Sequence, residues 1–156
     1  QEIYSHILQI NADSITEIDD SLLPTGRLMK VAGTAFDFTK PKEIGRDISK
    51  TQGGYDVNYV LNKKSPGELS FAAKVVEPQS GRVMEIFTTE PGIQFYSGNF
   101  LDGVKGKNGA IHKKHTAFCL ETQHYPDSPN QPSFPSTVLD VGQTYRHLTV
   151  HKFSVQ

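Results

Sequence analysis

The stretch ELSFAAKVVEPQSGRVMEIFTT, residues 68–89, carries the clearest structural pattern in the chain. Its first half has apolar side chains at alternate positions, namely Leu69, Phe71, Ala73 and Val75. This is the period of a strand with one buried face. The segment EPQSGR has the composition of a turn, and RVMEIFTT returns with Met84 and Ile86 on one side. We therefore predict an antiparallel hairpin over these residues.

Further strand patterns lie on both sides of this hairpin. We expect strands at residues 3–12, 59–61, 93–96, 117–121 and 144–155. The joins, such as LLPTG and PDSPNQP, are rich in turn residues. The only helical signal is a short turn in PKEIGRDIS after Pro41. The pattern predicts an all-β fold, with no linker between residues 1 and 156.

The composition argues against several classes of function. The chain has 16 basic and 17 acidic residues and a net charge of −1, so we expect no binding to nucleic acid or to an anionic membrane. No apolar run has the length of a membrane span. The histidines lack the spacing of metal ligands, and we predict no metal. The single cysteine, Cys119, has apolar neighbours, which predicts a buried thiol without a redox role.

The segment AFCLETQHYPDSPNQPSFPS, residues 117–136, contains the first candidate for chemistry. Glu121 lies in an otherwise apolar run that is followed by a proline-rich loop. A strand of this kind can hold one carboxylate away from water, and burial raises the pKa of a carboxyl group toward neutrality. The alternative is that Glu121 is a paired structural residue.

A second polar segment is TTEPGIQFYSGNFLDG, residues 88–103. Glycines and a proline flank Gln94, Tyr96 and Asn99, whose polar groups are costly to bury without hydrogen-bond partners. Amide side chains both donate and accept, which suits sugar hydroxyls. The alternative is a turn-rich connection in which Gln94 only satisfies backbone groups.

Several long strings resemble one known family. GIQFYSGNFLDG, KGKNGAIHKKHTAFCLETQHYPDSPNQPSFPS and GQTYRHLTVHKFS look like the C-terminal half of the galactose mutarotase, or aldose 1-epimerase, family, with a plant-like character. DSLLPTGRLMKVAGTAFDFTKPKEIGR and GGYDVNYVL match the same family in the same order. The resemblance therefore covers essentially the whole chain and identifies residues 1–156 as a single C-terminal portion of a mutarotase-like domain.

The resemblance implies a site and an activity. The family interconverts the α and β anomers of galactose or glucose without a metal or organic cofactor, so we expect a monosaccharide partner. Glu121 in CLETQ matches the family's general base, which takes the proton from the anomeric hydroxyl. Asp56 in GGYDVNY and Gln94 in PGIQFYSGN match residues that bind sugar hydroxyls. Without the resemblance, Asp56 follows two glycines and would be interpreted equally well as a turn cap.

Ring opening also requires an acid that protonates the ring oxygen. The resemblance implies a histidine in a motif like NHxYFNL, upstream of the matching region, together with a second histidine and an arginine. That motif surrounds none of the histidines, which are His6, His112, His115, His124, His147 and His151. We expect His115 in a solvated basic loop, and do not expect a local histidine to replace the missing acid. The chain is thus interpreted as a fragment with half an active site and little activity of its own.

The resemblance implies that the all-β chain forms an antiparallel β-sandwich, part of the family's large twisted supersandwich, which is built from a chain about twice as long. Half of it would leave strand edges unpaired, so we expect a second chain with the N-terminal half, self-association, or a rearranged compact sandwich. The alternatives to an epimerase are a non-catalytic, lectin-like protein that binds sugar through Asp56, Gln94 and Glu121, and a storage or defence protein that reuses the fold. The resemblance implies a cytoplasmic location, while the sequence is also compatible with secretion.

Overall fold

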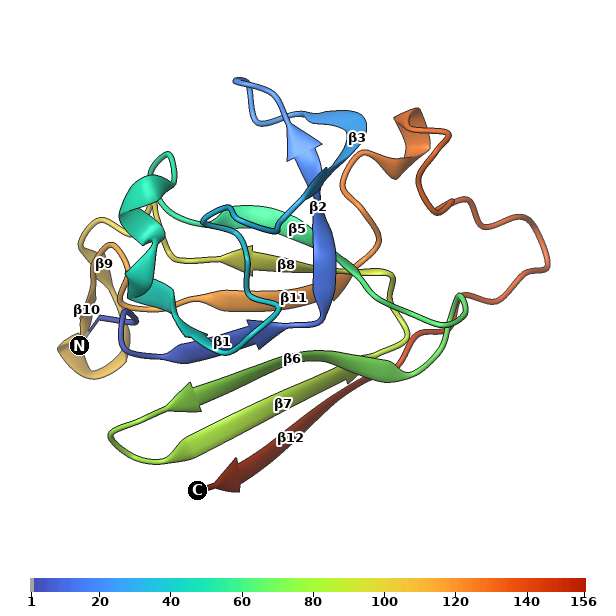
Figure 1. Cartoon of the computed structure of the whole chain (residues 1–156). Coiled ribbons are helices and arrows are strands. Elements are labelled where there is room, and N and C mark those ends of the chain that lie inside the picture. The colour runs from blue at the N-terminus through green and yellow to red at the C-terminus, as the bar shows by residue number, and fades with distance from the viewer. Residues whose placement is uncertain (1) are drawn as a thin grey trace.

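Two five-stranded antiparallel sheets make up most of the computed structural model, which describes residues 2–156 (Figure 1). The first sheet has the order β12-β7-β6-β1-β4, formed by Thr149–Val155, Arg82–Thr88, Ser70–Glu77, Ile7–Ile10 and Lys42–Glu43. The second has the order β11-β8-β5-β2-β3, formed by Cys119–Gln123, Gly92–Tyr96, Asp56–Leu61, Ala12–Ile18 and Pro24–Lys30. The predicted all-β, antiparallel fold class is confirmed.

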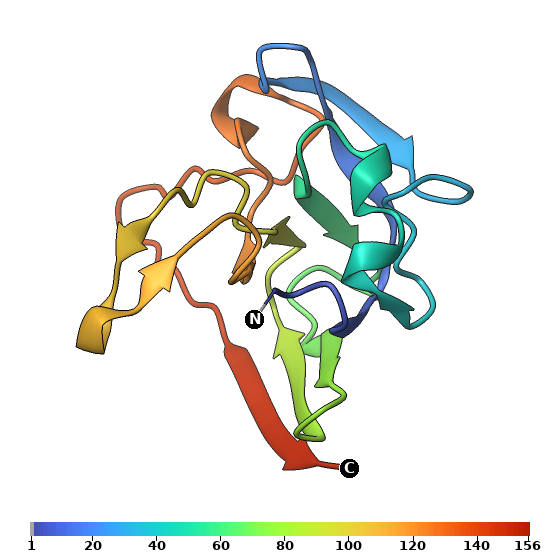
Figure 2. The same ribbon diagram turned by 90° about the vertical axis from the view of Figure 1, so that its left-hand side faces the viewer.

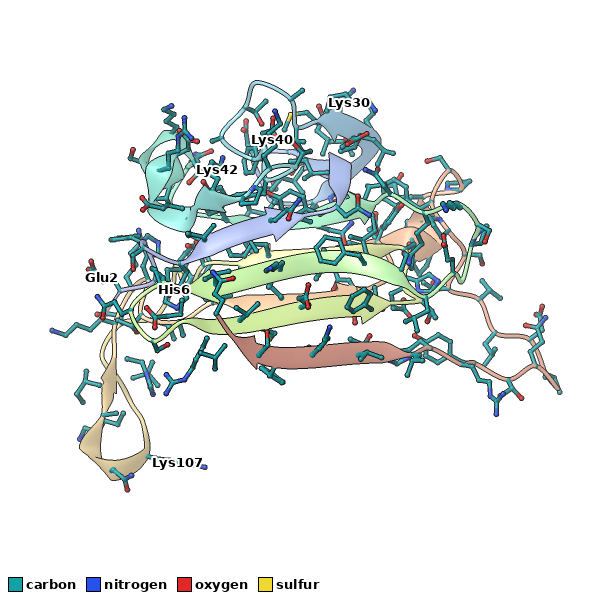
Figure 3. All side chains as sticks on the ribbon, turned by 60° about the horizontal axis from the view of Figure 1, so that its bottom comes forward. Glu2, His6, Lys30, Lys40, Lys42 and Lys107 are labelled. Carbon is teal, nitrogen blue, oxygen red and sulfur yellow. The ribbon has the colours of Figure 1, made fainter. Side chains whose placement is uncertain are left out.

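The remaining elements are short. Strands β9 (Val104–Lys105) and β10 (Ile111–His112) form a small hairpin that stands away from both sheets (Figure 2), with Lys107 near its tip (Figure 3). The helical segments are single 3-10 turns: η1 (Ile44–Arg46), η2 (Ile48–Lys50), η3 (Lys107–Gly109) and η4 (Ser128–Asn130). The first two confirm the turn predicted after Pro41. Within residues 2–156, no helix is long and apolar enough to cross a membrane.

The predicted hairpin of residues 68–89 is confirmed as β6 and β7. Its alternation is interrupted by a register shift between Phe71 and Ala73, after which Val75 pairs with Met84. Because a bulge adds one residue to a strand, Ala72 and Ala73 are both fully buried, whereas Leu69 at the strand's start is exposed. The prediction that Leu69 shares the buried face was therefore wrong.

The single strand expected over residues 3–12 is in fact divided between the two sheets. The chain turns at Asn11, whose N–H donates to the Ala72 carbonyl (2.8 Å) and whose carbonyl accepts the N–H of Asn62 (2.9 Å). The Asn11 side-chain amide also donates to the Phe71 carbonyl at 3.1 Å. These bonds satisfy the backbone at the bend, so β1 ends in one sheet and β2 begins in the other.

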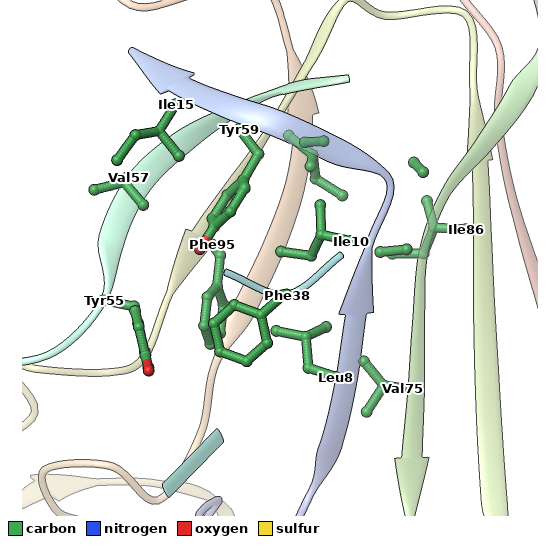
Figure 4. Close-up of a cluster of buried hydrophobic side chains, with 14 of the residues drawn as sticks. Leu8, Ile10, Ile15, Phe38, Tyr55, Val57, Tyr59, Val75, Ile86 and Phe95 are labelled. Atoms are coloured by element: carbon green, nitrogen blue, oxygen red, sulfur yellow. The ribbon is translucent and has the colours of Figure 1, made fainter. Parts of the chain in front are cut away.

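The core lies between the sheets and has an aromatic centre (Figure 4). The Tyr55 and Phe95 rings stack with centroids 5.0 Å apart, and Phe38 meets both of them edge-on. The Tyr59 hydroxyl donates to the Phe36 carbonyl at 3.0 Å, and burial raises the pKa of Tyr59 well above its ordinary value. The core therefore packs directly beneath β5 and β8.

A buried carboxylate ties the segment that precedes β12 to the second sheet. Glu90 is only 3% exposed. Its Oε2 lies 2.7 Å from His124 Nδ1, and its Oε1 accepts a hydrogen bond from the Tyr145 hydroxyl at 2.8 Å. The hydrogen bond to Glu90 raises the pKa of Tyr145. β12 itself starts at Thr149, so the strand predicted over residues 144–155 begins later than expected.

A second ionic group holds the 3-10 turns. Lys42 Nζ lies 3.0 Å from Asp47 Oδ2, and Lys50 Nζ lies 2.8 Å from Asp47 Oδ1. The Lys42 ammonium is also 4.2 Å from the centre of the Phe38 ring. The hydrogen bonds from Lys50 and then Lys42 lower the pKa of Asp47 from 3.8 to about 2.

Replacing Glu90 by alanine should destabilise the fold, because the Tyr145 hydroxyl and the His124 ring both lose their acceptor. We expect a loss of about 1–3 kcal/mol in the free energy of unfolding, measured by urea denaturation. Glu85→Ala is the matched control, since the Glu85 carboxylate lies 3.7 Å from the exposed Lys152 ammonium. The control should change stability by less than about 1 kcal/mol. Equal losses in both variants would contradict the role given to Glu90.

Asp47 should make a pH-dependent contribution to stability. Its folded-state pKa lies below the ordinary value, so the contribution is complete above the ordinary value of 3.8 and is lost as the pH falls toward 2. The difference in urea midpoint between the unchanged chain and Asp47→Asn should therefore be largest near neutral pH and should shrink on acidification through this window. A difference that stays constant over that range would exclude this contribution.

Candidate active site

The three residues matched to the family site lie on adjacent strands. Glu121 of β11 is the register partner of Gln94 in β8, and Asp56 of β5 is the partner of Tyr96, two residues further along β8. Side chains two residues apart point to the same face of a strand. Glu121, Gln94 and Asp56 accordingly line one open hollow of about 370 Å³, together with Tyr96, Phe100, Gln123 and Pro126.

A hydrogen-bond chain runs across the floor of this hollow. The Gln123 amide donates to Gln94 Oε1 at 3.3 Å, and the Gln94 amide donates to Asp56 Oδ1 at 2.8 Å. The Gln94 side chain is therefore oriented by hydrogen bonds on both sides. Both bonds are to side chains, whereas the alternative interpretation expected Gln94 only to satisfy backbone groups. One oxygen of Asp56 is used in this chain, which leaves the other in position to accept from a bound hydroxyl.

Glu121 is exposed, so the expectation that it is held out of water was wrong. The reason is that Glu121 lies on the open face of β11, an edge strand of the second sheet as described, whereas Phe118 and Leu120 pack against the core on the other face. The prediction of a buried Cys119 was wrong for the same reason, because this thiol is also exposed. Neighbouring atoms still desolvate the thiol in part, and this, with the charge and hydrogen bond of the Glu121 carboxylate, raises the pKa of Cys119.

Two further polar residues on this face escaped the sequence analysis. Gln123 follows Glu121 by two positions, and Asn58 follows Asp56 by two, so strand alternation alone would have indicated both. The Gln123 amide donates to Asn58 Oδ1 at 3.2 Å. Asn58 is buried, and its Nδ2 has no hydrogen-bond partner among residues 2–156. Gln94 and Asn58 are register partners, which extends the polar row into the sheet.

Three of the histidines are engaged away from Glu121. His124 contacts Glu90, and His147 Nδ1 lies 3.9 Å from the same carboxylate. These two line a larger hollow of about 1040 Å³, which holds none of the three matched residues. His115 is 7% exposed, so the prediction of a solvated loop position was wrong. Burial lowers the pKa of His115. Residues 2–156 contain no cluster of three or more histidine, cysteine or acidic side chains arranged to hold a metal.

Side-chain hydrogen bonds brace the turn that follows β8, which ends at Tyr96. The Asn99 amide donates to the Tyr55 carbonyl (2.9 Å), and its Oδ1 accepts from Ser97 Oγ (2.6 Å). His115 Nε2 lies 3.2 Å from the same Asn99 oxygen. Asn99 is thus a structural brace beside the hollow, while Tyr96 is one of its lining residues.

The fold is that of a known class of β-sandwich, the aldose epimerases. The crystal structure of the GalM/aldose epimerase homologue from C. elegans is similar, with a TM-score of 0.90 and 32% identity over 99% of this chain and 47% of that one. The crystal structure of galactose 1-epimerase from Lactobacillus acidophilus gives a TM-score of 0.69 with 26% identity, covering 99% of this chain and 45% of that one.

The sequence places the chain within this class. Residues 1–152 match the aldose 1-epimerase family, and the chain belongs to it. It is 50% identical over 155 residues to galactose mutarotase of Homo sapiens, which covers 98% of this chain and 45% of that protein. It is 35% identical to aldose 1-epimerase of Escherichia coli over 97% of this chain and 46% of that one. The chain thus spans about half the length of these relatives.

Substitution of Gly54 should disturb the braced turn. Gly54 has φ +125°, and an added Cβ would lie 1.9 Å from Asn99 Oδ1. Its neighbour Gly53 also has a positive φ, +92°, but an added Cβ there meets nothing within 4 Å, which makes Gly53→Ala the matched control. We expect Gly54→Ala to lose about 1–3 kcal/mol more than the control in urea denaturation and to shift the Asn99 amide signals in NMR spectra. Equal losses would show that backbone strain alone accounts for the effect.

Proposed function

We propose that this chain is part of an aldose 1-epimerase that interconverts the α and β anomers of galactose or glucose, and that it supplies the general base. The observation that carries the proposal is the alignment of Glu121, Gln94 and Asp56 in one hollow across three neighbouring strands. Family membership supports it, because these residues lie in the strings that resemble the family's motifs.

Each residue has a defined task in the proposed reaction. The exposed Glu121 carboxylate accepts the proton of the anomeric hydroxyl as the hemiacetal opens. Asp56 accepts hydrogen bonds from other hydroxyls of the sugar, and Gln94 both donates to them and accepts from them. These bonds hold the sugar ring against the sheet. The hydrogen bond of 2.8 Å between Gln94 and Asp56 keeps both side chains oriented before the sugar binds. This favours binding, because the two side chains lose less conformational entropy when the sugar binds.

The acid that protonates the ring oxygen is proposed to come from outside these residues. In this proposal residues 1–156 correspond to a C-terminal portion of the family's domain, and an N-terminal portion or a second copy completes the site. Large exposed apolar side chains on and before β12 support a missing neighbour, namely Val138, Leu139, Val141, Phe153 and Val155. The plant-like character of the motifs stays a prediction from the sequence.

The proposal favours catalysis over a lectin-like, storage or defence role. The human and Escherichia coli relatives are named as a mutarotase and an epimerase, and no feature of the hollow specifically favours the non-catalytic alternatives. We further propose a cytoplasmic location, by analogy with the family.

Replacing Glu121 by glutamine should remove the base while keeping its size. The rate of α-D-galactose mutarotation is followed by polarimetry for the 156-residue chain, alone and after mixing with the N-terminal portion of human galactose mutarotase. We expect enzymatic mutarotation only in the mixture. Native mass spectrometry of the same mixture shows whether the two polypeptides form a complex. Glu121→Gln should then lower the rate by about 10²-fold or more.

The control for this experiment is Glu85→Gln, which changes a carboxylate on the other sheet. It should leave the rate of the mixture unchanged. A mixture that turns over equally well with Glu121→Gln would refute the assignment of the base. A complex that forms, contains the intact Glu121 and still shows no exchange would favour a non-catalytic sugar-binding protein.

A further inference from the structure

Phe100 is a large apolar side chain that the fold leaves in water. It is 73% exposed, although it follows the buried Gly98 by only two residues. Exposing an aromatic ring forgoes the stabilisation that burial would provide. Phe100 lines the same hollow as Glu121 and Gln94, and it also lines a second hollow of about 530 Å³ that adjoins it at Asp56.

The ring is nevertheless held in place. Phe100 stacks on Tyr96 with centroids 6.1 Å apart and an interplanar angle of 22°. The Phe100 N–H donates to the Tyr96 hydroxyl oxygen at 2.9 Å, so backbone and ring are fixed by the same partner. Tyr96 in turn belongs to β8 and faces Asp56 across the ladder. The two rings therefore form an aromatic wall at the end of the row that carries Gln94.

The loop behind this wall is braced through the core. The Tyr55 N–H donates to Ser97 Oγ at 2.8 Å, and the Asn99 amide returns to the Tyr55 carbonyl at 2.9 Å. The brace continues from Asn99 Oδ1 to His115, whose Nδ1 lies 2.8 Å from the Tyr4 hydroxyl. A rigid, exposed aromatic ring beside hydrogen-bonding side chains is a preorganised surface for a ligand that has both apolar and polar faces.

A pyranose ring is such a ligand, because its hydroxyls lie around the rim and its C–H groups lie on the faces. In galactose the axial 4-hydroxyl leaves H3, H4 and H5 together on one face, whereas in glucose the C–H groups alternate between faces. The face of an aromatic ring is electron-rich and attracts such C–H groups. Resting on the proposed function, we propose that Tyr96 and Phe100 form the wall on which this C–H face stacks, and that Phe100 selects galacto-configured hexoses.

Saturation-transfer NMR on the unmodified 156-residue chain tests this directly. Irradiating the aromatic protons should saturate H3, H4 and H5 of D-galactose more strongly than its other protons. Phe100→Ala should remove this pattern and lower galactose affinity by about three- to tenfold. Phe100→Leu, which keeps an apolar side chain without the ring, should bring the ratio of galactose to glucose affinity close to that of Phe100→Ala.

Phe153→Ala is the matched control, because Phe153 is 72% exposed and lies on β12 in the other sheet. It should leave the transfer pattern and both affinities unchanged. A pattern that persists in Phe100→Ala, or a preference for galactose that persists in Phe100→Leu, would overturn this inference and leave the assignment of Glu121 as base intact. Absence of any transfer to galactose in the unmodified chain would contradict sugar binding altogether.

Discussion

The antiparallel pairing of β8 with β5 on one side and β11 on the other is the constraint on which the site depends. In this register, Ile93 and Phe95 point into the core, and Gln94 and Tyr96 point to the open face. A slip of one residue would exchange the two faces, burying an amide and exposing a core ring. The burial of Phe95 against Tyr55 fixes the register of β8. The same packing therefore also fixes the position of the Gln94 side chain in the hollow.

The same coupling links the loop at the end of β8 to the core. Tyr55 stacks on Phe95 with its ring and holds Ser97 and Asn99 with its backbone. Gly54, directly before it, leaves room for the Asn99 side chain. The buried Tyr55 thus contacts both β8, through Phe95, and the loop that follows β8. It therefore stabilises both the floor of the hollow and the aromatic wall at its end.

Residue periodicity was sufficient for the features that depend on one strand and its neighbour along the chain. The hairpin of β6 and β7 follows from the alternation of apolar side chains along residues 68–89. The bend at Asn11 was missed because its hydrogen bonds reach Ala72 and Asn62, residues distant in sequence. The register that brings Asp56, Gln94 and Glu121 together likewise depends on strand order, and came from the family resemblance and not from the pattern.

The exposure of Glu121 and Cys119 shows the limit of local patterns more sharply. An apolar run predicts a strand, but whether that strand is central or at an edge depends on which strand lies beside it. His115 shows the converse, since its basic neighbours indicated solvent while Tyr4 and Asn99 hold it in the interior.

Because β11 is an edge strand, the surroundings of the proposed base, Glu121, depend on whether another polypeptide pairs with that strand. Within residues 2–156, one side of that strand pairs with no other strand, and the Glu121 carboxylate belongs to the same few residues. Any polypeptide that completed the hydrogen-bond ladder along Cys119–Gln123 would at the same time remove water from around the Glu121 carboxylate. Pairing at this edge would therefore change the hydration of the Glu121 side chain together with the backbone of its strand.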